Sequence, residues 1–254
     1  MQMLQGVLLD ISGVLYVDDQ PVQGSIEALE RLRSAGLKMR LVTNSSRAPG
    51  HAIVEKLRHM GFNVDAEHLL TAPQAIHAHL RAHALTPLLL VHPALRAEFA
   101  DLEAPDPNAV VVCDAGAEFT YERLDAAFQL LSRGAPLLAV GDNRYFWSAG
   151  ALHLDAGPFV RALAYAAEVE PVYLGKPAVG FFEQACAAMG TRPEHTWMVG
   201  DDWEADVVGA LNAGLQASLV TTGKYRAGDE TRAGRRKLHL GRDLISLVNQ
   251  RLGE

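Results

Sequence analysis

The stretch Gly6-Val7-Leu8-Leu9-Asp10-Ile11-Ser12-Gly13-Val14 decides how the rest of the chain is interpreted. Residues 6–9 form an apolar, partly β-branched run that is typical of a buried parallel strand. The run ends on Asp10, and Gly13 follows in a turn. Open α/β sheets bind ligands at the carboxyl ends of their strands, so Asp10 is a candidate nucleophile or metal ligand. In the alternative interpretation, Asp10 only caps the following turn.

The composition is that of a globular protein. The chain has 254 residues, 49% of them hydrophobic, which is enough for one large core or two modest cores. The formal net charge of -7 comes without a block of like charge, so we expect no nucleic-acid partner and no membrane partner. Cys113 and Cys186 lie far apart in apolar contexts, which favours buried free thiols. The first residues do not resemble a signal peptide, and we expect a cytoplasmic protein.

Strand and helix patterns alternate along the chain and predict an α/β fold with a Rossmann-like parallel sheet. A helix is expected to begin with Ser25 as its N-cap and to stop at Gly36. Residues 141–154 are expected to be irregular. Further strands are predicted at 38–43, 69–71, 88–91, 109–113, 137–140, 196–200 and 216–220, and further helices at 49–60, 73–84, 94–99, 121–133, 158–168 and 243–252. One more helix is expected to follow Pro177 and to end at Gly190.

The middle of the chain is expected to form a small α/β domain inserted into the first domain. Its strand ends do not carry acids in the pattern that the flanking strands share. We therefore assign residues 1–75 and 176–254 to a discontinuous core and residues 76–175 to the inserted domain.

Three more strand or loop ends carry polar residues that one sheet edge would bring close to Asp10. These residues are Thr43, Lys176 and Asp201. Each has a structural alternative: Thr43 is a common residue at strand ends, Lys176 is an ordinary surface lysine, and Asp201 charges a helix N-terminus favourably. Their joint occurrence in this order favours a single functional pocket.

The acids of this pocket predict a metal ion. Asp201, Asp202 and Asp206 would repel Asp10 strongly unless a divalent cation lay among them. Hard oxygen ligands, with no histidine or cysteine at metal-binding spacing, favour Mg²⁺.

The ordered motifs resemble those of a known phosphatase superfamily. Asp10-x-Ser12-Gly13-Val14, Thr43-Asn44, Gly175-Lys176-Pro177 and Gly200-Asp201-Asp202-x-x-x-Asp206 are similar to the four motifs of the haloacid dehalogenase-like (HAD) phosphatases. The inserted domain resembles the C2-type cap of the type IIA branch. Three further stretches are similar to members that act on phosphohistidine, phospholysine and inorganic pyrophosphate: Asp114-Ala115-Gly116, Leu154-Asp155-Ala156-Gly157-Pro158 and Thr222-Gly223-Lys224.

The resemblance implies a role for each motif residue. Asp10 would form an aspartyl-phosphate, and Lys176 would balance its charge. Mg²⁺ would be held by Asp10, the main-chain carbonyl of Ser12 and Asp201, with Asp202 and Asp206 supporting the metal through waters or neighbouring contacts. The substrate would be bound by Asp10, Ile11, Ser12, Thr43, Asn44 and Lys176.

Ser12 departs from the general superfamily pattern. Most of these phosphatases have a second aspartate two residues after the nucleophile, which protonates the leaving group and later activates water. A serine hydroxyl is a much weaker acid near neutral pH. We therefore expect poor hydrolysis of alkyl phosphates and better turnover of pyrophosphate, aryl phosphates and N–P bonds.

The inserted domain is expected to decide which leaving group is accepted. Candidates that would face it are Asp114, Glu118, Asn143, Arg144, Tyr145 and Trp147. In an equally acceptable interpretation, Tyr145 and Trp147 belong to the core of that domain or to a dimer contact. The resemblance implies a homodimer. Thr222-Gly223-Lys224 lacks a full glycine-rich phosphate-binding pattern and is expected to be a plain turn.

The sequence thus predicts a Mg²⁺-dependent phosphatase for a phosphate monoester, a phosphoramidate or pyrophosphate. Two alternatives of the same fold remain. One is a phosphate-binding regulator that turns over weakly, for which Ser12 is the best argument. The other is a phosphotransferase that passes the phosphoryl group from Asp10 to an acceptor other than water.

Overall fold

The computed structural model describes residues 4–148, 150–233 and 238–253. The chain divides into two compact units by its internal contacts. The first unit comprises residues 1–43, 53–70 and 176–254, and the second comprises residues 44–52 and 71–175. The short segment 44–52 thus packs with the second unit, whereas the sequence assigned it to the core.

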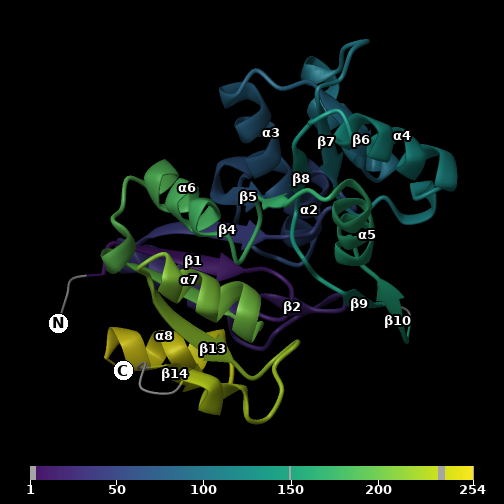
Figure 1. The fold of residues 1–254 in the computed structure, drawn as a ribbon. Coiled ribbons are helices and arrows are strands. Elements are labelled where there is room, and N and C mark those ends of the chain that lie inside the picture. The colour runs from purple at the N-terminus through teal and green to yellow at the C-terminus, as the bar shows by residue number, and fades with distance from the viewer. Residues whose placement is uncertain (1–3, 149, 234–237, 254) are drawn as a thin grey trace. The chain divides into compact units, whose positions relative to one another are not determined.

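A six-stranded sheet in the order β14-β13-β12-β1-β4-β5 forms the centre of the first unit (Figure 1). Strand β1 pairs in parallel with β12 and β4, and β13 pairs in parallel with β12 and β14. Residues 7–9 of β1 are fully buried, as expected for a central parallel strand. The strands are β1 (Gly6–Asp10), β4 (Lys38–Thr43), β5 (Leu69–Thr71), β12 (Thr196–Gly200), β13 (Gln216–Val220) and β14 (His239–Gly241).

Helices pack on this sheet in two pairs. Helix α1 packs against α8, and α6 packs against α7. Figure 1 shows α7 and α8 on different sides of β13. The helices are α1 (Ser25–Ser34), α6 (Val179–Met189), α7 (Gly209–Asn212) and α8 (Leu244–Leu252), and α2 (Gly50–His59) begins in the second unit and continues in the first. The shorter elements are β2 (Tyr16–Val17), β3 (Gln20–Pro21), η1 (Ala66–His68), η4 (Pro193–His195), η5 (Trp203–Val208) and η6 (Asp229–Ala233).

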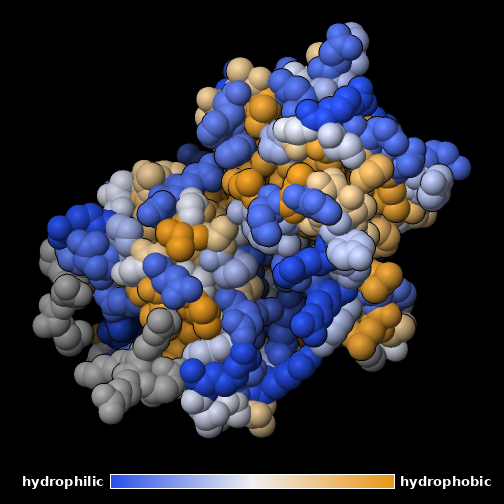
Figure 2. Space-filling model, in the orientation of Figure 1, coloured by the Kyte–Doolittle hydropathy of each residue, from blue (hydrophilic) through white to orange (hydrophobic). Residues whose placement is uncertain are grey.

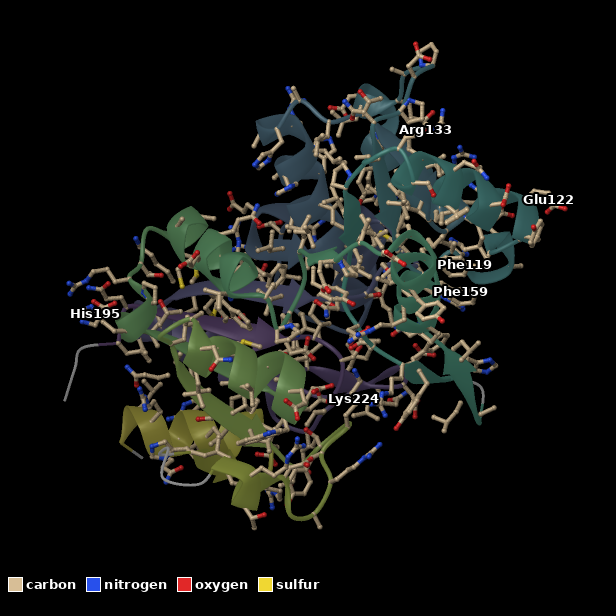
Figure 3. The ribbon with its side chains drawn as sticks, in the orientation of Figure 1. Phe119, Glu122, Arg133, Phe159, His195 and Lys224 are labelled. Carbon is tan, nitrogen blue, oxygen red and sulfur yellow. The ribbon has the colours of Figure 1, made fainter. Side chains whose placement is uncertain are left out.

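The second unit has its own parallel sheet in the order β11-β8-β7-β6 and its own apolar core. The rings of Phe119 and Phe159 stack with their centroids 3.7 Å apart (Figure 3), and Phe119 packs against this core. The elements are α3 (Ala72–Ala82), β6 (Pro87–Leu90), η2 (Pro93–Leu102), β7 (Ala109–Val112), η3 (Gly116–Glu118), α4 (Tyr121–Leu131), β8 (Leu137–Ala139), β9 (Tyr145–Ser148), β10 (Ala151–Leu154), α5 (Gly157–Ala167) and β11 (Val172–Tyr173).

Three local expectations were wrong. Residues 141–154 are not irregular throughout, because β9 and β10 pair there as an antiparallel hairpin. Strand β14 was not expected, and it extends the first sheet beside β13. The N-cap of α1 is Gly24 at a φ of 77°, because the Ser25 hydroxyl instead donates to the Leu15 carbonyl at 2.9 Å.

The β9–β10 hairpin exposes apolar side chains. Leu152 and Leu154 are 58% and 62% exposed, and Figure 2 shows hydrophobic surface over this hairpin. Among the described residues, no helix combines the length and the apolar character needed to span a membrane.

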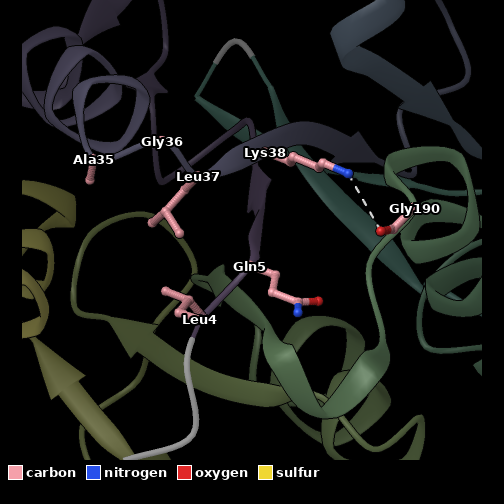
Figure 4. Close-up of a pocket in the computed structure, with 7 residues that line it drawn as sticks. All are labelled: Leu4, Gln5, Ala35, Gly36, Leu37, Lys38 and Gly190. Atoms are coloured by element: carbon pink, nitrogen blue, oxygen red, sulfur yellow. Dashed lines mark hydrogen bonds between the residues drawn. The ribbon is translucent and has the colours of Figure 1, made fainter.

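A pocket of about 480 Å³ lies at the amino-terminal edge of the first sheet (Figure 4). It is lined by residues that precede β1 and β4, including Gln5 and Leu37, and by Gly190 at the end of α6. Lys38 reaches across it, with its ammonium 3.5 Å from the Gly190 carbonyl oxygen. This pocket lies at the opposite end of β1 from Asp10.

Candidate active site

Asp10 ends β1 at the carboxyl edge of the sheet, beside two strands that lead to other predicted site residues. Asp10 stands opposite Val42 of β4, so Thr43 is the next residue along this edge. Leu9 stands opposite Val199 of β12, so β12 ends beside Asp10 and Asp201 follows it directly. The parallel register therefore brings these polar side chains to one edge, where all are buried.

Lys176 is the closest cation to Asp10 in the described part of the site. Its ammonium donates to Asp10 Oδ1 at 2.5 Å and to Asp206 Oδ1 at 2.6 Å. The lysine side chain is only 4% exposed. Burial alone would lower the pKa of Lys176, but the charges of Asp10 and Asp206 outweigh it and raise the pKa above its ordinary value. Lys176 is therefore a permanent positive charge between two carboxylates.

Asp10, Asp201 and Asp206 form a buried carboxylate cluster in which one oxygen of each lies within 4.8 Å of the others. Burial, followed by repulsion from Asp10 and Asp206, raises the pKa of Asp201 to about 8. Burial also raises the pKa of Asp206, although Lys176 opposes this shift. The three carboxylates are thus short of positive charge. Their hard oxygen donors fit a divalent cation such as Mg²⁺.

Asp201 is held from two sides by glycine-containing turns. A Cβ atom added at Gly13 or at Gly223 would lie 2.0 Å from Asp201 Oδ2, so neither position has room for a side chain. The main-chain amide of Lys224 donates to the same oxygen at 2.7 Å. The Thr222 hydroxyl donates to the Gly13 carbonyl, which ties the two turns together. The sequence predicted only a plain turn at 222–224, so this role was missed. The signal that could have indicated it is the position of the turn directly after a parallel strand.

Asp202 has a different environment from Asp201 and Asp206. Its carboxylate accepts the amides of Glu204 and Ala205 at 3.0 Å, so it caps the helical segment η5. The Lys224 ammonium lies 3.6 Å from Asp202 Oδ2. Burial would raise the pKa of Asp202, but Lys224 and these amides lower it below its usual value. Asp202 therefore remains a carboxylate at the rim of the cluster.

The other predicted residues of the first two motifs directly follow Asp10 or Thr43 in the chain. Ile11 is 2% exposed, whereas Ser12 is exposed. The Ser12 hydroxyl lies 3.4 Å from the Tyr16 hydroxyl and donates to it. Asn44 directly follows Thr43 and is the first residue of the second unit.

In the second unit, Asp114 forms a local ion pair. It is 5% exposed and accepts from Arg47 Nε at 2.5 Å and from Arg47 Nη2 at 3.3 Å. Its main-chain amide donates to the Ser46 hydroxyl at 3.0 Å. Sequence reasoning named Asp114 but not Arg47, whose only signal was its place shortly after Thr43-Asn44. Asp114 thus anchors Arg47.

The other leaving-group candidates of this unit are only partly described. Glu118 pairs with Arg123. Tyr145 is 43% exposed, and the side chain of Trp147 lies outside the described residues.

Two family models match the chain. One, described as haloacid dehalogenase-like hydrolase, matches residues 7–104, and another, described as HAD-hydrolase-like, matches residues 173–247. The haloacid dehalogenase-like hydrolase domain-containing protein 2 of Bos taurus is 40% identical over 89% of this chain and 88% of its own length. The phospholysine phosphohistidine inorganic pyrophosphate phosphatase of Xenopus laevis is 40% identical over 89% of this chain and 87% of its own length.

Solved structures share the whole fold. A 4-nitrophenylphosphatase from Thermotoga maritima has a TM-score of 0.90 and 28% identity, covering 97% of both chains. A glycerol phosphate phosphatase from Mycobacterium tuberculosis in complex with magnesium has a TM-score of 0.85 and 27% identity, covering 97% of this chain and 77% of its own. These likenesses confirm the predicted HAD fold class.

Proposed function

The chain belongs to the haloacid dehalogenase-like hydrolase family and is a phosphohydrolase, and from this premise we propose that it uses Mg²⁺ and Asp10 to hydrolyse a phosphate monoester, a phosphoramidate or pyrophosphate. One observation carries the proposal: the buried Lys176 ammonium bridges Asp10 and Asp206, at 2.5 and 2.6 Å. A buried carboxylate at a strand end, beside a cation and further acids, is better suited to be a nucleophile than to be one half of a structural ion pair.

Asp10 does the covalent chemistry. One of its carboxylate oxygens forms a bond to phosphorus, while the bond from phosphorus to the leaving group breaks and its electron pair departs with that group. Water then attacks the aspartyl-phosphate, the bond between Asp10 and phosphorus breaks, and orthophosphate leaves. Splitting one displacement into two replaces one difficult step by two easier ones.

Lys176 and the residues after β4 hold the phosphoryl group. The Lys176 ammonium offsets the negative charge of Asp10 and of the incoming phosphoryl oxygens, which would otherwise repel each other. The Thr43 hydroxyl and the Asn44 main chain hydrogen-bond the phosphoryl oxygens. Ile11 and Ser12 line the same turn after Asp10.

The carboxylate cluster provides the ligands for Mg²⁺. Asp10, Asp201 and the Ser12 carbonyl would hold the ion, and Asp206 and Asp202 would support it through waters or neighbouring contacts. The raised pKa of Asp201 supports this assignment, because a buried carboxylate with too little positive charge nearby is a good site for a cation. When bound, the ion neutralises charge that builds up on the transferring phosphoryl oxygens.

Ser12 limits the range of leaving groups. A serine hydroxyl does not protonate an alkoxide efficiently near neutral pH, so alkyl phosphates are poor substrates. The leaving groups of pyrophosphate, of aryl phosphates and of compounds with N–P bonds depart with little protonation from the enzyme. The Xenopus laevis relative is named for phospholysine, phosphohistidine and inorganic pyrophosphate, which are substrates of this class.

The second unit acts as a cap that selects the leaving group. Within this unit, Asp114 holds the partly exposed Arg47 in an ion pair. We also propose that the protein is a homodimer, which sedimentation or light scattering of the purified chain would test.

The test is phosphate release by the wild type and by Asp10→Asn. The substrates are pyrophosphate, phosphohistidine, p-nitrophenyl phosphate and two alkyl phosphates, each with Mg²⁺ and with a chelator. We expect turnover that needs Mg²⁺ and is abolished by Asp10→Asn. If no substrate is hydrolysed but orthophosphate still binds, the chain is a regulator. If phosphate release rises with added alcohol acceptors and new phosphate esters form, it is a phosphotransferase.

A further inference from the structure

We propose that Lys224 binds a second anionic group on the substrate and so favours leaving groups that carry negative charge, such as the distal phosphoryl group of pyrophosphate. The inference rests on the proposed function, because it assigns a substrate-binding residue to the same site. It concerns a lysine in the turn after β13, which lies outside the four superfamily motifs and within the Thr222-Gly223-Lys224 stretch quoted above.

The turn that carries Lys224 is fixed against the carboxylate cluster. The Lys224 amide donates to Asp201 Oδ2 at 2.7 Å, and Gly223 packs so closely that an added Cβ would lie 2.6 Å from Gly13 Cα. Thr222 donates to the Gly13 carbonyl. These three contacts fix the main chain of the turn, so the Lys224 side chain starts from a defined point beside the proposed metal ligand.

The ammonium of Lys224 is placed to meet a substrate, whereas that of Lys176 is already engaged. Lys176 is 4% exposed and has two carboxylate oxygens within 2.6 Å. The Lys224 side chain is 59% exposed, and its ion pair with Asp202 is long, at 3.6 Å. In Figure 3, Lys224 and His195 lie at opposite ends of the first unit. His195 directly precedes β12 and so marks the amino edge of the sheet. A flexible lysine at this edge can move to an incoming anion at little cost.

The charge of the site favours this role. The turn that carries Lys224 contacts Asp201 of the carboxylate cluster, and the Lys224 ammonium lies 3.6 Å from Asp202 Oδ2. Together, Asp10, Asp201, Asp202 and Asp206 bring four carboxylates to this edge of the sheet. Lys176 and a divalent cation together offset three of these four charges, and a substrate with two phosphoryl groups adds several more. Among the described residues, Lys224 is a cation beside the cluster that can offset the negative charge of the second phosphoryl group.

An alternative role for Lys224 is purely structural, through Asp202. In that case the lysine would only help to hold the cap of η5 and the orientation of Asp201. Such a role would affect every substrate equally, because every substrate uses the same Asp10 and Asp201. Comparison of substrates with and without a second anionic group separates the two roles.

The experiment compares Lys224→Ala and Lys224→Arg with the wild type at saturating Mg²⁺. Lys38→Ala is the matched control, because Lys38 is an exposed lysine at the opposite edge of the sheet. The readouts are KM and kcat for pyrophosphate and for p-nitrophenyl phosphate, whose leaving group has no second phosphoryl group. The inhibition constants of methylenediphosphonate and orthophosphate against p-nitrophenyl phosphate hydrolysis measure binding without turnover.

For Lys224→Ala we expect KM for pyrophosphate and the inhibition constant of methylenediphosphonate to rise about tenfold, as for loss of one charge-assisted hydrogen bond. The values for p-nitrophenyl phosphate and orthophosphate should change by less than about twofold. Lys224→Arg should restore most of the loss, and Lys38→Ala should match the wild type.

Equal losses on both kinds of ligand, or no loss on either, would overturn the proposal. Failure of the underlying function gives a different result, namely no Mg²⁺-dependent phosphate release by the wild type from any substrate. If the wild type hydrolyses p-nitrophenyl phosphate but binds methylenediphosphonate no more tightly than orthophosphate, the function stands and the role of Lys224 is wrong.

Discussion

The Lys176 ammonium lies 2.6 Å from Asp206 Oδ1, and the two side chains are 4% and 1% exposed. The same ammonium binds Asp10, so one lysine links the proposed nucleophile to a carboxylate on the segment after β12. Asp206 also accepts the amide of Asp202 at 3.1 Å, which fixes its own orientation. Removing the lysine would therefore leave two buried carboxylates unpaired, at a cost to both catalysis and folding.

Lys176→Met should reduce kcat by at least about a hundredfold, because it removes the positive charge that the phosphoryl group and Asp10 share. In the presence of a chelator, it should also lower the free energy of unfolding by about 3–5 kcal/mol, the usual effect of breaking a buried ion pair. Steady-state kinetics and urea unfolding measure the two effects. Lys38→Met, at an exposed lysine, is the control. A Lys176→Met enzyme with near-normal kcat would contradict the proposed role.

Gly223→Ala should weaken Mg²⁺ binding by at least about tenfold, because the new Cβ would lie 2.0 Å from Asp201 Oδ2 and displace a proposed ligand. Gly36→Ala is a matched control: its φ of 75° resembles the 65° of Gly223, and an added Cβ meets nothing within 4 Å. Both variants should lose about 1 kcal/mol of stability from the left-handed backbone. The readout is phosphate release against Mg²⁺ concentration, and equal Mg²⁺ dependence in the two variants would show that the turn does not position Asp201.

The elements that the sequence predicted well are those whose burial follows a simple pattern. Strand β1 is a fully buried apolar run that stops on an acid, and β12 repeats this arrangement before Asp201. Strand β14 was missed because it lies at the edge of the sheet and is mostly exposed, so it shows neither an apolar run nor alternation. The β9–β10 hairpin was missed because all four residues of β10 are exposed, so this strand has no buried face to mark it.

The site residues could be predicted from the order of the strand ends, because parallel strands deliver their carboxyl ends to one edge. The contacts that orient those residues could not. Gly13, Asp201 and Gly223 meet only after the sheet has formed, and no local pattern links them. The pairing of Asp114 with Arg47 likewise joins residues far apart in the chain. Local sequence thus indicated which groups gather, and tertiary packing decides what each of them binds.

The stability of the chelated protein should fall as the pH rises from about 4 to about 8. Burial and the neighbouring carboxylates raise the pKa of Asp201 from 3.8 to about 8 in the folded state. A group whose folded pKa is raised stabilises the fold while it is protonated, and this contribution is lost as the pH rises through the folded pKa. Melting temperatures measured with chelator should therefore fall more steeply for the wild type than for Asp201→Asn, and parallel curves would show that Asp201 does not titrate in this range.

Ser12→Asp should widen the range of leaving groups. An aspartic acid two residues after the nucleophile can protonate an alkoxide as it departs, and positioned general acids contribute about a hundredfold or more to such steps. We expect kcat/KM for alkyl phosphates to rise at least about tenfold, while the value for p-nitrophenyl phosphate, whose leaving group needs little protonation, changes by less than about threefold. Ser12→Asn is the control, since it has a similar size and no acidic proton. Should the ratio of alkyl to aryl phosphate turnover be the same in the wild type and in Ser12→Asp, Ser12 would not be what limits the choice of leaving group.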